Sequence, residues 1–375
     1  MSILDYFNPL LRTSLYIHIP FCRRKCLYCD FFSVNSQQEI VNAYVDKVVA
    51  EIEQASGYFT DGFYTAYIGG GSPSILSPEL LERICKAVCI RKKPEEFTVE
   101  FNPEHFSDDY SYLFENYFNR ISMGVQSLNP LILKVLGRNA SLKQTYRALE
   151  LTQNLHEKTG TDLSYDLICC VRGSESEVLS DVEKLLNSFP SDHLSIYSLT
   201  SSEHAPLFSS GEYKELDNDV QADILKQIWS FMSENAYEHY EVSNFARKGK
   251  RCKHNMVYWN YGQFIGLGTS ASGTAFGEKG AFRITGQCNI PEYNRSDVFS
   301  CYETEKLSSS VQATEMIMLG TRIVDGINLQ RLKQDYGIQL NHFPSFYKKT
   351  ENRLIPNGNE ALLLSDYAAQ LLTDF

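Results

Sequence analysis

The chain has 375 residues, of which 43% are hydrophobic, so it can build the core of one large domain or of two. Its net charge of −11 disfavours broad binding to nucleic acid, because such binding needs a basic surface that displaces counterions. The sequence shows neither a run of the roughly 20 apolar residues that span a bilayer nor the pattern of a signal peptide. We therefore expect a cytoplasmic protein without a transmembrane segment.

Short apolar runs alternate with helical patterns as far as Glu234. We expect strands at Leu15–Ile19, Thr65–Ile68, Phe97–Phe101, Arg120–Val125, Leu163–Cys170 and His193–Leu199. The helical patterns lie at Glu39–Ala55, Ser77–Cys89, Asp108–Tyr117, Ser141–His156, Val178–Asn187 and Val220–Glu234. Six such units predict an α/β fold, a parallel sheet curved into a partial (βα)6 barrel. Ligand groups gather at the carboxyl ends of the strands in such folds.

The character of the sequence changes after about residue 245. Glycines become dense between Gly262 and Gly286, among several aromatic residues, and a compact helical stretch begins at about Ser308. We expect a core barrel at 1–245, a segment rich in glycine and aromatic residues at 246–300, and a small helical C-terminal domain at 301–375.

Three cysteines, Cys22, Cys26 and Cys29, follow the first predicted strand with gaps of three and two residues. A cytoplasmic chain with ten cysteines favours metal ligands or buried thiols over a disulfide framework. Three thiolates in a loop can bind three irons of a 4Fe–4S cluster and leave the fourth iron open for S-adenosylmethionine (SAM). The alternative is a structural zinc loop completed by a distant ligand.

The CxxxCxxC pattern after the first strand of a strand–helix series resembles the signature of radical SAM proteins. Its wider context, from Tyr16 to Phe31, resembles the HemN/HemW group, which contains oxygen-independent coproporphyrinogen III oxidases and heme chaperones. The similarity extends from about residue 15 to the terminal domain. It implies a 4Fe–4S cluster on the three cysteines, bound SAM, and a C-terminal domain of the HemN type.

The resemblance also implies a set of SAM contacts, each at or near the end of a predicted strand or in the cysteine loop. The segment from Gly69 to Ser74 resembles the group's GGGTPS motif. The set comprises Tyr16, Tyr28, Gly70, Gly71, Ser72, Glu100, Gln126, Arg138 and Asp166. Considered singly, the glycines are also explained by a tight turn, and Glu100 by a solvent-facing charge.

One stretch departs from the group's pattern. The group reads DLIxGLPG after the fifth strand, whereas this chain has Cys170 in place of a glycine and Arg172 in place of a proline. We interpret Cys169 and Cys170 as a buried strand end. Cys85 and Cys89 lie one helical turn apart and are expected in the core.

Two features distinguish members of the group. The oxidases carry a fourth cysteine two residues after the third, and here that position is Phe31. They also have a long segment before the cluster loop and a second SAM site, whereas only 21 residues precede Cys22 here. Both features favour the heme chaperones.

The segment from Cys252 to Trp259 resembles the HNxxYW motif that is linked to heme binding in the chaperones. His254 is the predicted heme contact, because a neutral imidazole is a good axial ligand, and Cys252 is the alternative ligand. A buried histidine within an aromatic cluster explains the same residues without heme.

The sequence thus favours a protein that binds heme and delivers it to acceptor proteins, with a SAM-coordinating cluster and an electron donor. The alternative is a coproporphyrinogen III dehydrogenase that decarboxylates propionate side chains. A third hypothesis is a cytoplasmic protein with a structural metal site. A loose membrane association would be compatible with delivery of heme to respiratory proteins, although the sequence contains no motif for one.

Overall fold

The computed structural model describes residues 2–358, apart from 175–176, 210, 212 and 341–342. Its main sheet has twelve strands in the order β12-β11-β10-β9-β1-β2-β3-β4-β5-β6-β8-β7. Six consecutive parallel strands form its centre: β1 (Ser14–Ile19), β2 (Thr65–Gly70), β3 (Glu96–Phe101), β4 (Arg120–Gln126), β5 (Asp162–Cys169) and β6 (His193–Ser198). Because the strand order ends in β12 and β7, the sheet is open and forms a partial barrel, as predicted.

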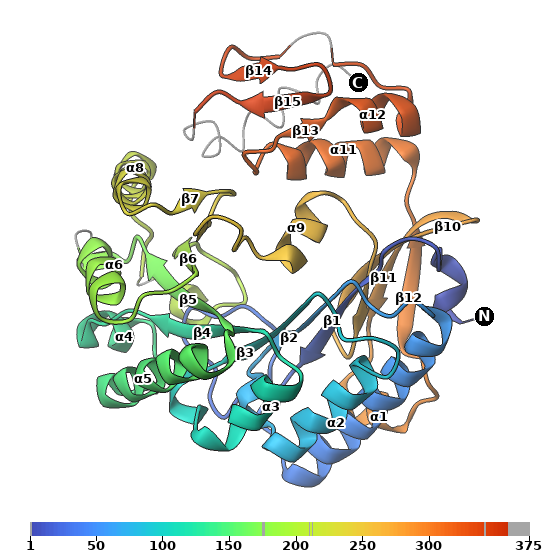
Figure 1. The fold of residues 1–375 in the computed structure, drawn as a ribbon, viewed down its shortest axis with the longest axis horizontal. Helices are drawn as coiled ribbons and strands as arrows, with labels where there is room; N and C mark the ends of the chain where they lie inside the picture. Colours follow the sequence, from blue (N-terminus) through green and yellow to red (C-terminus); the bar gives the residue numbers. More distant parts are fainter. Residues whose placement is uncertain (1, 175–176, 210, 212, 341–342, 359–375) are drawn as a thin grey trace.

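Helices connect these strands and cover their outer face (Figure 1). They are α1 (Gln38–Tyr58), α2 (Pro78–Val88), α3 (Ser111–Asn116), α4 (Pro130–Val135), α5 (Leu142–Thr159), α6 (Glu177–Ser188), the short α7 (Pro206–Ser209) and α8 (Asn218–Glu234). Local sequence sets several of their ends. Ser141 and Gln144 form a reciprocal capping box at the start of α5, and Gly160 ends that helix in a left-handed conformation.

The segment after residue 235 extends the sheet on both sides. The short strands β7 (Glu238–His239) and β8 (Asn244–Ala246) add antiparallel to β6. On the other side β9 (Phe264–Leu267) adds parallel to β1, followed by the antiparallel strands β10 (Ser272–Gly277), β11 (Gly280–Gly286) and β12 (Tyr302–Lys306). Two further helices, α9 (Lys253–Trp259) and α10 (Ile290–Arg295), lie between these strands in the sequence.

The C-terminal part has its own small core. Helices α11 (Ser309–Gly320) and α12 (Leu329–Tyr336) pack with a three-stranded sheet in the order β13-β15-β14, formed by Ile327–Asn328, Arg353–Pro356 and Tyr347–Lys349. The predicted helical domain is present, and the structure adds this sheet to it. Figure 1 shows α9 between this domain and the central strands. Within the described part of the chain, no helix combines the length and the apolar character needed to cross a membrane.

Candidate functional site

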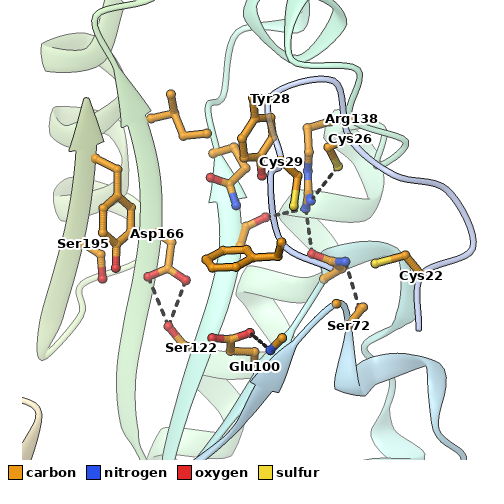
Figure 2. A pocket seen from close by; sticks show the side chains of 18 of the residues that line it. Cys22, Cys26, Tyr28, Cys29, Ser72, Glu100, Ser122, Arg138, Asp166 and Ser195 are labelled. Atoms are coloured by element: carbon orange, nitrogen blue, oxygen red, sulfur yellow. Dashed lines mark hydrogen bonds between the residues drawn. The ribbon is translucent and has the colours of Figure 1, made fainter. Parts of the chain in front are cut away.

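A cavity of about 470 Å³ opens at the carboxyl ends of the central strands. The loop between β1 and α1 forms one wall and contributes Cys22, Cys26 and Cys29. Polar side chains from β2 to β6 line the interior, among them Glu100 and Asp166. Figure 2 shows the three cysteines on one side of this space and the two carboxylates across from them. The volume falls within the range of roughly 300–1,000 Å³ typical of small-molecule sites.

The three cysteines are half-buried in a loop that backbone bonds hold in place. Cys22 N donates to Val34 O, and Cys29 N donates to Cys26 O. Among the described residues, no group of three His, Cys, Asp or Glu side chains is placed to bind one ion. Three thiolates in one loop are compatible with a cluster, in which each thiolate binds a different iron.

Charge around the thiols also fits such a cluster. Burial raises the pKa of Cys22, and it raises that of Cys29 to about 11. Iron must therefore displace protons from these thiols when it binds. The guanidinium of Arg138 lies 3.6 Å from Cys26 Sγ, where its positive charge favours the thiolate.

Arg138 also links the cysteine loop to the strands. Its Nη2 donates to Asn102 Oδ1 (3.0 Å) and to Gly124 O (2.8 Å), and Asn102 Nδ2 donates to Ser72 Oγ (3.0 Å). The buried Nε of Arg138 has no hydrogen-bond partner among the residues that the structure describes. Sequence reasoning missed Asn102, although it lies only two residues after Glu100.

The glycine turn after β2 permits close packing against the first strand and the cysteine loop. Gly70 has φ +111°, and a Cβ there would lie 2.6 Å from the ring of His18. A Cβ on Gly71 would lie 2.7 Å from Phe21 O. These glycines thus hold the motif against the cluster loop, and neither position accepts a larger residue without movement.

Two buried carboxyl groups face the cavity. Glu100 accepts from Tyr67 OH (2.7 Å) and from Gly70 N (3.3 Å), and burial raises its pKa to about 7. Asp166 accepts from Ser122 Oγ (2.9 Å), and burial raises its pKa as well. A cationic ligand would hold both groups ionised, and SAM carries positive charge on its sulfonium and its ammonium groups. The two carboxyl groups are therefore compatible with the cationic groups of SAM.

The other predicted SAM contacts differ in whether they line the cavity. Tyr28 and Gln126 line the cavity, whereas Tyr16 does not: its hydroxyl lies 3.0 Å from His18 Nδ1. Gln126 has φ +67° at a register shift that ends β4. Such a conformation costs about 1 kcal/mol in a non-glycine residue and re-aims the side chain.

His254 is fully buried on α9, beside the cavity-lining residue Tyr67 of β2. Its Nδ1 lies 2.7 Å from Thr65 Oγ1, whose proton goes to Ser14 Oγ, so the network assigns Nδ1 as the donor. Its Nε2 accepts from Tyr258 OH (2.6 Å). Burial lowers the pKa of His254 to about 3, consistent with a neutral ring.

Both nitrogens of His254 are thus engaged, and axial ligation of heme requires release of the bond to Tyr258. The ring also stacks on Tyr67, with centroids 5.2 Å apart, and Tyr67 in turn donates to Glu100. Cys252, the alternative ligand, is buried and lies 3.3 Å from a carboxylate oxygen of Glu96. Heme contact by His254 or Cys252 stays a prediction.

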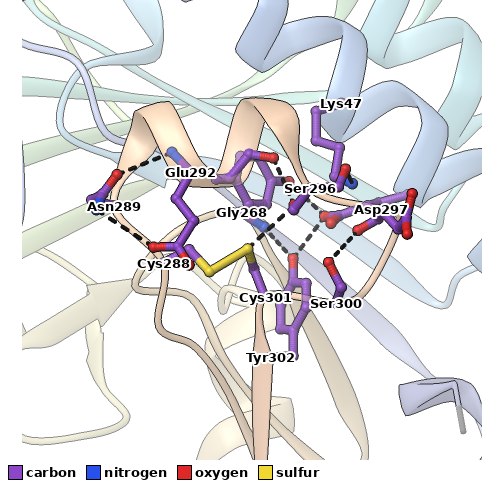
Figure 3. Close-up of a disulfide and its surroundings, with 12 residues drawn as sticks. Lys47, Gly268, Cys288, Asn289, Glu292, Ser296, Asp297, Ser300, Cys301 and Tyr302 are labelled. Carbon is purple, nitrogen blue, oxygen red and sulfur yellow. Dashed lines mark hydrogen bonds between the residues drawn. A yellow bond between two sulfur atoms is a disulfide. The ribbon is translucent and has the colours of Figure 1, made fainter.

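The remaining cysteines confirm one expectation and correct another. Cys85, Cys169 and Cys170 are buried, and Cys89 is half-buried and packs against the core. Cys170 has φ +60°, the left-handed region that favours glycine, so its backbone is strained where the group has a glycine. The expectation of free or metal-bound cysteines is wrong for Cys288 and Cys301, which form a disulfide between the ends of β11 and β12 (Figure 3).

The disulfide closes a segment that contains α10. Figure 3 shows this segment against α1, where Lys47 Nζ donates to Ser296 O (2.7 Å). Tyr293 OH donates to the buried Glu51 of α1 at 2.6 Å. The sequence did not indicate this pairing because it depends on the antiparallel pairing of β11 with β12, which brings together two cysteines that lie 13 residues apart on either side of α10.

A partial (βα)6 barrel with three cysteines after its first strand and a cavity suited to SAM defines a radical SAM protein. Residues 16–185 match the family model of the Radical SAM superfamily. Heme chaperone HemW of Lactococcus lactis (strain IL1403) is 33% identical over 371 residues, which cover 96% of this chain and 93% of that protein. HemW of Escherichia coli (strain K12) is 35% identical over 267 residues, 69% of each chain. The chain belongs to the HemW family.

A solved structure supports the same architecture. The coproporphyrinogen III oxidase HemN from Escherichia coli, a radical SAM enzyme, superposes with a TM-score of 0.80 over 99% of this chain and 92% of that one. The sequence identity is 17%, so this match shows a shared fold. The fold shared with HemN includes the C-terminal part, beyond the barrel itself.

Proposed function

We propose that this protein binds heme and delivers it to acceptor proteins, and that it carries a SAM-coordinating 4Fe–4S cluster. The observation that carries the proposal is the 33% identity with a heme chaperone over 96% of this chain. This similarity includes the barrel, the α9 region and the C-terminal domain. Phe31 occupies the position at which coproporphyrinogen oxidases have a fourth cysteine, which is consistent with a chaperone.

Different residues of the site would bind the cluster and SAM. Cys22, Cys26 and Cys29 would hold the cluster, with the Arg138 guanidinium beside Cys26. Glu100 and Asp166 would orient SAM by charge. When bound, the cluster can supply one electron that cleaves the C–S bond of SAM to give a 5′-deoxyadenosyl radical.

Heme transfer tests the proposal. The protein with a reconstituted cluster is loaded with one equivalent of heme under anaerobic conditions, and a tagged apo-cytochrome is added as acceptor. We expect heme to appear on the acceptor when the two proteins are separated, and the loaded protein to protect heme from a free chelator until the acceptor is added. Failure to bind heme, with the cluster intact, would overturn the proposal.

A further inference from the structure

The mouth of the cavity, near the cysteine loop and the end of β6, is mixed in chemistry. Ser198, Thr200, Ser201 and Ser202 line it there, and aromatic and aliphatic side chains lie among them. These apolar lining residues are Tyr28, Phe31, Ile168, Tyr197 and Leu199. The backbone bond from Leu207 N to Leu27 O (2.7 Å) ties the segment after β6 to the cysteine loop, so the two sides of the mouth are held together.

Two aromatic side chains at this mouth are exposed. Phe31 is 63% exposed and Tyr197 is 43% exposed, whereas rings of the barrel core such as Phe97 are fully buried. Ile168 and Leu199, which line the cavity beside them, belong to a separate apolar cluster and are almost fully buried. The two exposed rings offer flat surfaces to a ligand.

Two cations lie at the rim. Arg24 and Lys25 line the cavity from the cysteine loop, together with the acidic Asp30 of that loop and Glu104 after β3. This pair of cations contrasts with the net charge of −11 of the whole chain. It suits a ligand with carboxylate groups at one edge.

We infer that the mouth is the heme-binding site: the macrocycle packs against Phe31 and Tyr197, and its propionates face Arg24 and Lys25. This inference rests on the proposed function, which supplies heme as the ligand. A flat ring with two apolar faces and two carboxylates at one edge matches the aromatic pair and the cationic rim. The cavity is too small to enclose heme together with SAM, so heme enters by one edge and stays partly outside. This site lies beside the cysteine loop, whereas His254 is fully buried on α9, next to Cys252 and Asn255, which line the same cavity from another side.

Heme titration followed by absorbance, on protein with a reconstituted cluster, tests the aromatic pair. We expect Phe31→Ala and Tyr197→Ala to weaken heme binding about tenfold each, a loss of about 1.4 kcal/mol apiece. Phe32→Ala is the matched control, because Phe32 is 40% exposed next to Phe31 and does not line the cavity. It should leave the affinity within about twofold. Cluster absorbance shows that each variant is folded and loaded.

The cationic rim is tested in the same way. The double variant Arg24→Glu/Lys25→Glu should weaken the binding of heme more than the binding of heme dimethyl ester, which lacks free carboxylates. Arg23→Glu is the control, because Arg23 is exposed and does not line the cavity. This control variant should change the affinity for the two ligands equally. If the wild-type protein binds heme and the Phe31→Ala/Tyr197→Ala double variant binds it equally well, the mouth site is wrong and the proposed function stands. If the wild-type protein binds no heme, the proposed function itself fails.

Discussion

At neutral pH the buried carboxyl group of Glu100 lowers the free energy of unfolding of the protein. The Glu100→Gln variant should reveal by how much. Burial raises the pKa of Glu100 from its ordinary 4.5 to about 7. Below 4.5 the group is protonated in both the folded and the unfolded protein, so it contributes nothing to the pH dependence. As the pH rises from 4.5 to 7, the unfolded chain loses the proton and the folded protein keeps it, so stability falls. Above 7 both forms are ionised and the loss is constant.

The magnitude follows from the size of the shift. A difference of 2.5 pKa units between 7 and 4.5 corresponds to about 3 kcal/mol, of which about 2–3 kcal/mol develops between pH 5 and pH 8. Glutamine does not titrate, so the variant lacks this loss. It has one acceptor oxygen for the two donors Tyr67 OH and Gly70 N, which costs about 1–3 kcal/mol at either pH.

Urea unfolding at pH 5 and at pH 8, without SAM and at equal cluster content, measures the effect. The stability of Glu100→Gln relative to wild type should rise by about 2–3 kcal/mol from the lower pH to the higher one. The same variant should bind SAM at least about tenfold more weakly, since a charge-assisted contact is lost. An identical pH dependence in both proteins would refute the assigned ionisation of Glu100.

Three further outcomes follow from the site. Cys26→Ala should abolish the charge-transfer absorbance of the cluster, and an unchanged spectrum after reconstitution would remove Cys26 from the ligand set. His254→Ala should lower the free energy of unfolding by about 3 kcal/mol and should weaken SAM binding, because Tyr67 loses its stacking partner. An unaltered SAM affinity in a calorimetric titration would show that His254 does not act on the SAM site through Tyr67. Cys301→Ser should destabilise the protein by about 3 kcal/mol, measured by urea unfolding without reductant, and reduced wild type should match the variant, since the bond to Cys288 closes a short loop.

The central strands could be predicted closely because buried parallel strands are apolar runs bounded by turn residues. The strand predicted at Leu15–Ile19 is observed at Ser14–Ile19, and the one predicted at Phe97–Phe101 at Glu96–Phe101. The glycine-rich strands β9 to β11 escaped prediction. A Cβ on Gly266 would lie 2.1 Å from Ser272 O, so close approach of two chain segments, rather than strand propensity, selects glycine there.

The candidate site likewise combines residues that a local motif predicts with partners that it does not predict. The motif residues Ser72 and Arg138 could be taken from local pattern, and the structure joins them through Asn102, which has no pattern of its own. The contacts of His254 depend on Thr65, which lies 189 residues away in the sequence. Such long-range partners follow from the topology of the barrel, and the spacing of a motif contains no information about them.

Turnover of coproporphyrinogen III tests most directly whether this radical SAM barrel serves heme delivery or porphyrin decarboxylation. The protein with a reconstituted cluster is incubated anaerobically with coproporphyrinogen III, SAM and a strong reductant, beside an authentic oxidase as control. The account predicts no protoporphyrinogen from this protein while its cluster absorbance persists and the control is active. Sustained formation of protoporphyrinogen would contradict the account and show that Phe31 is no barrier to decarboxylation.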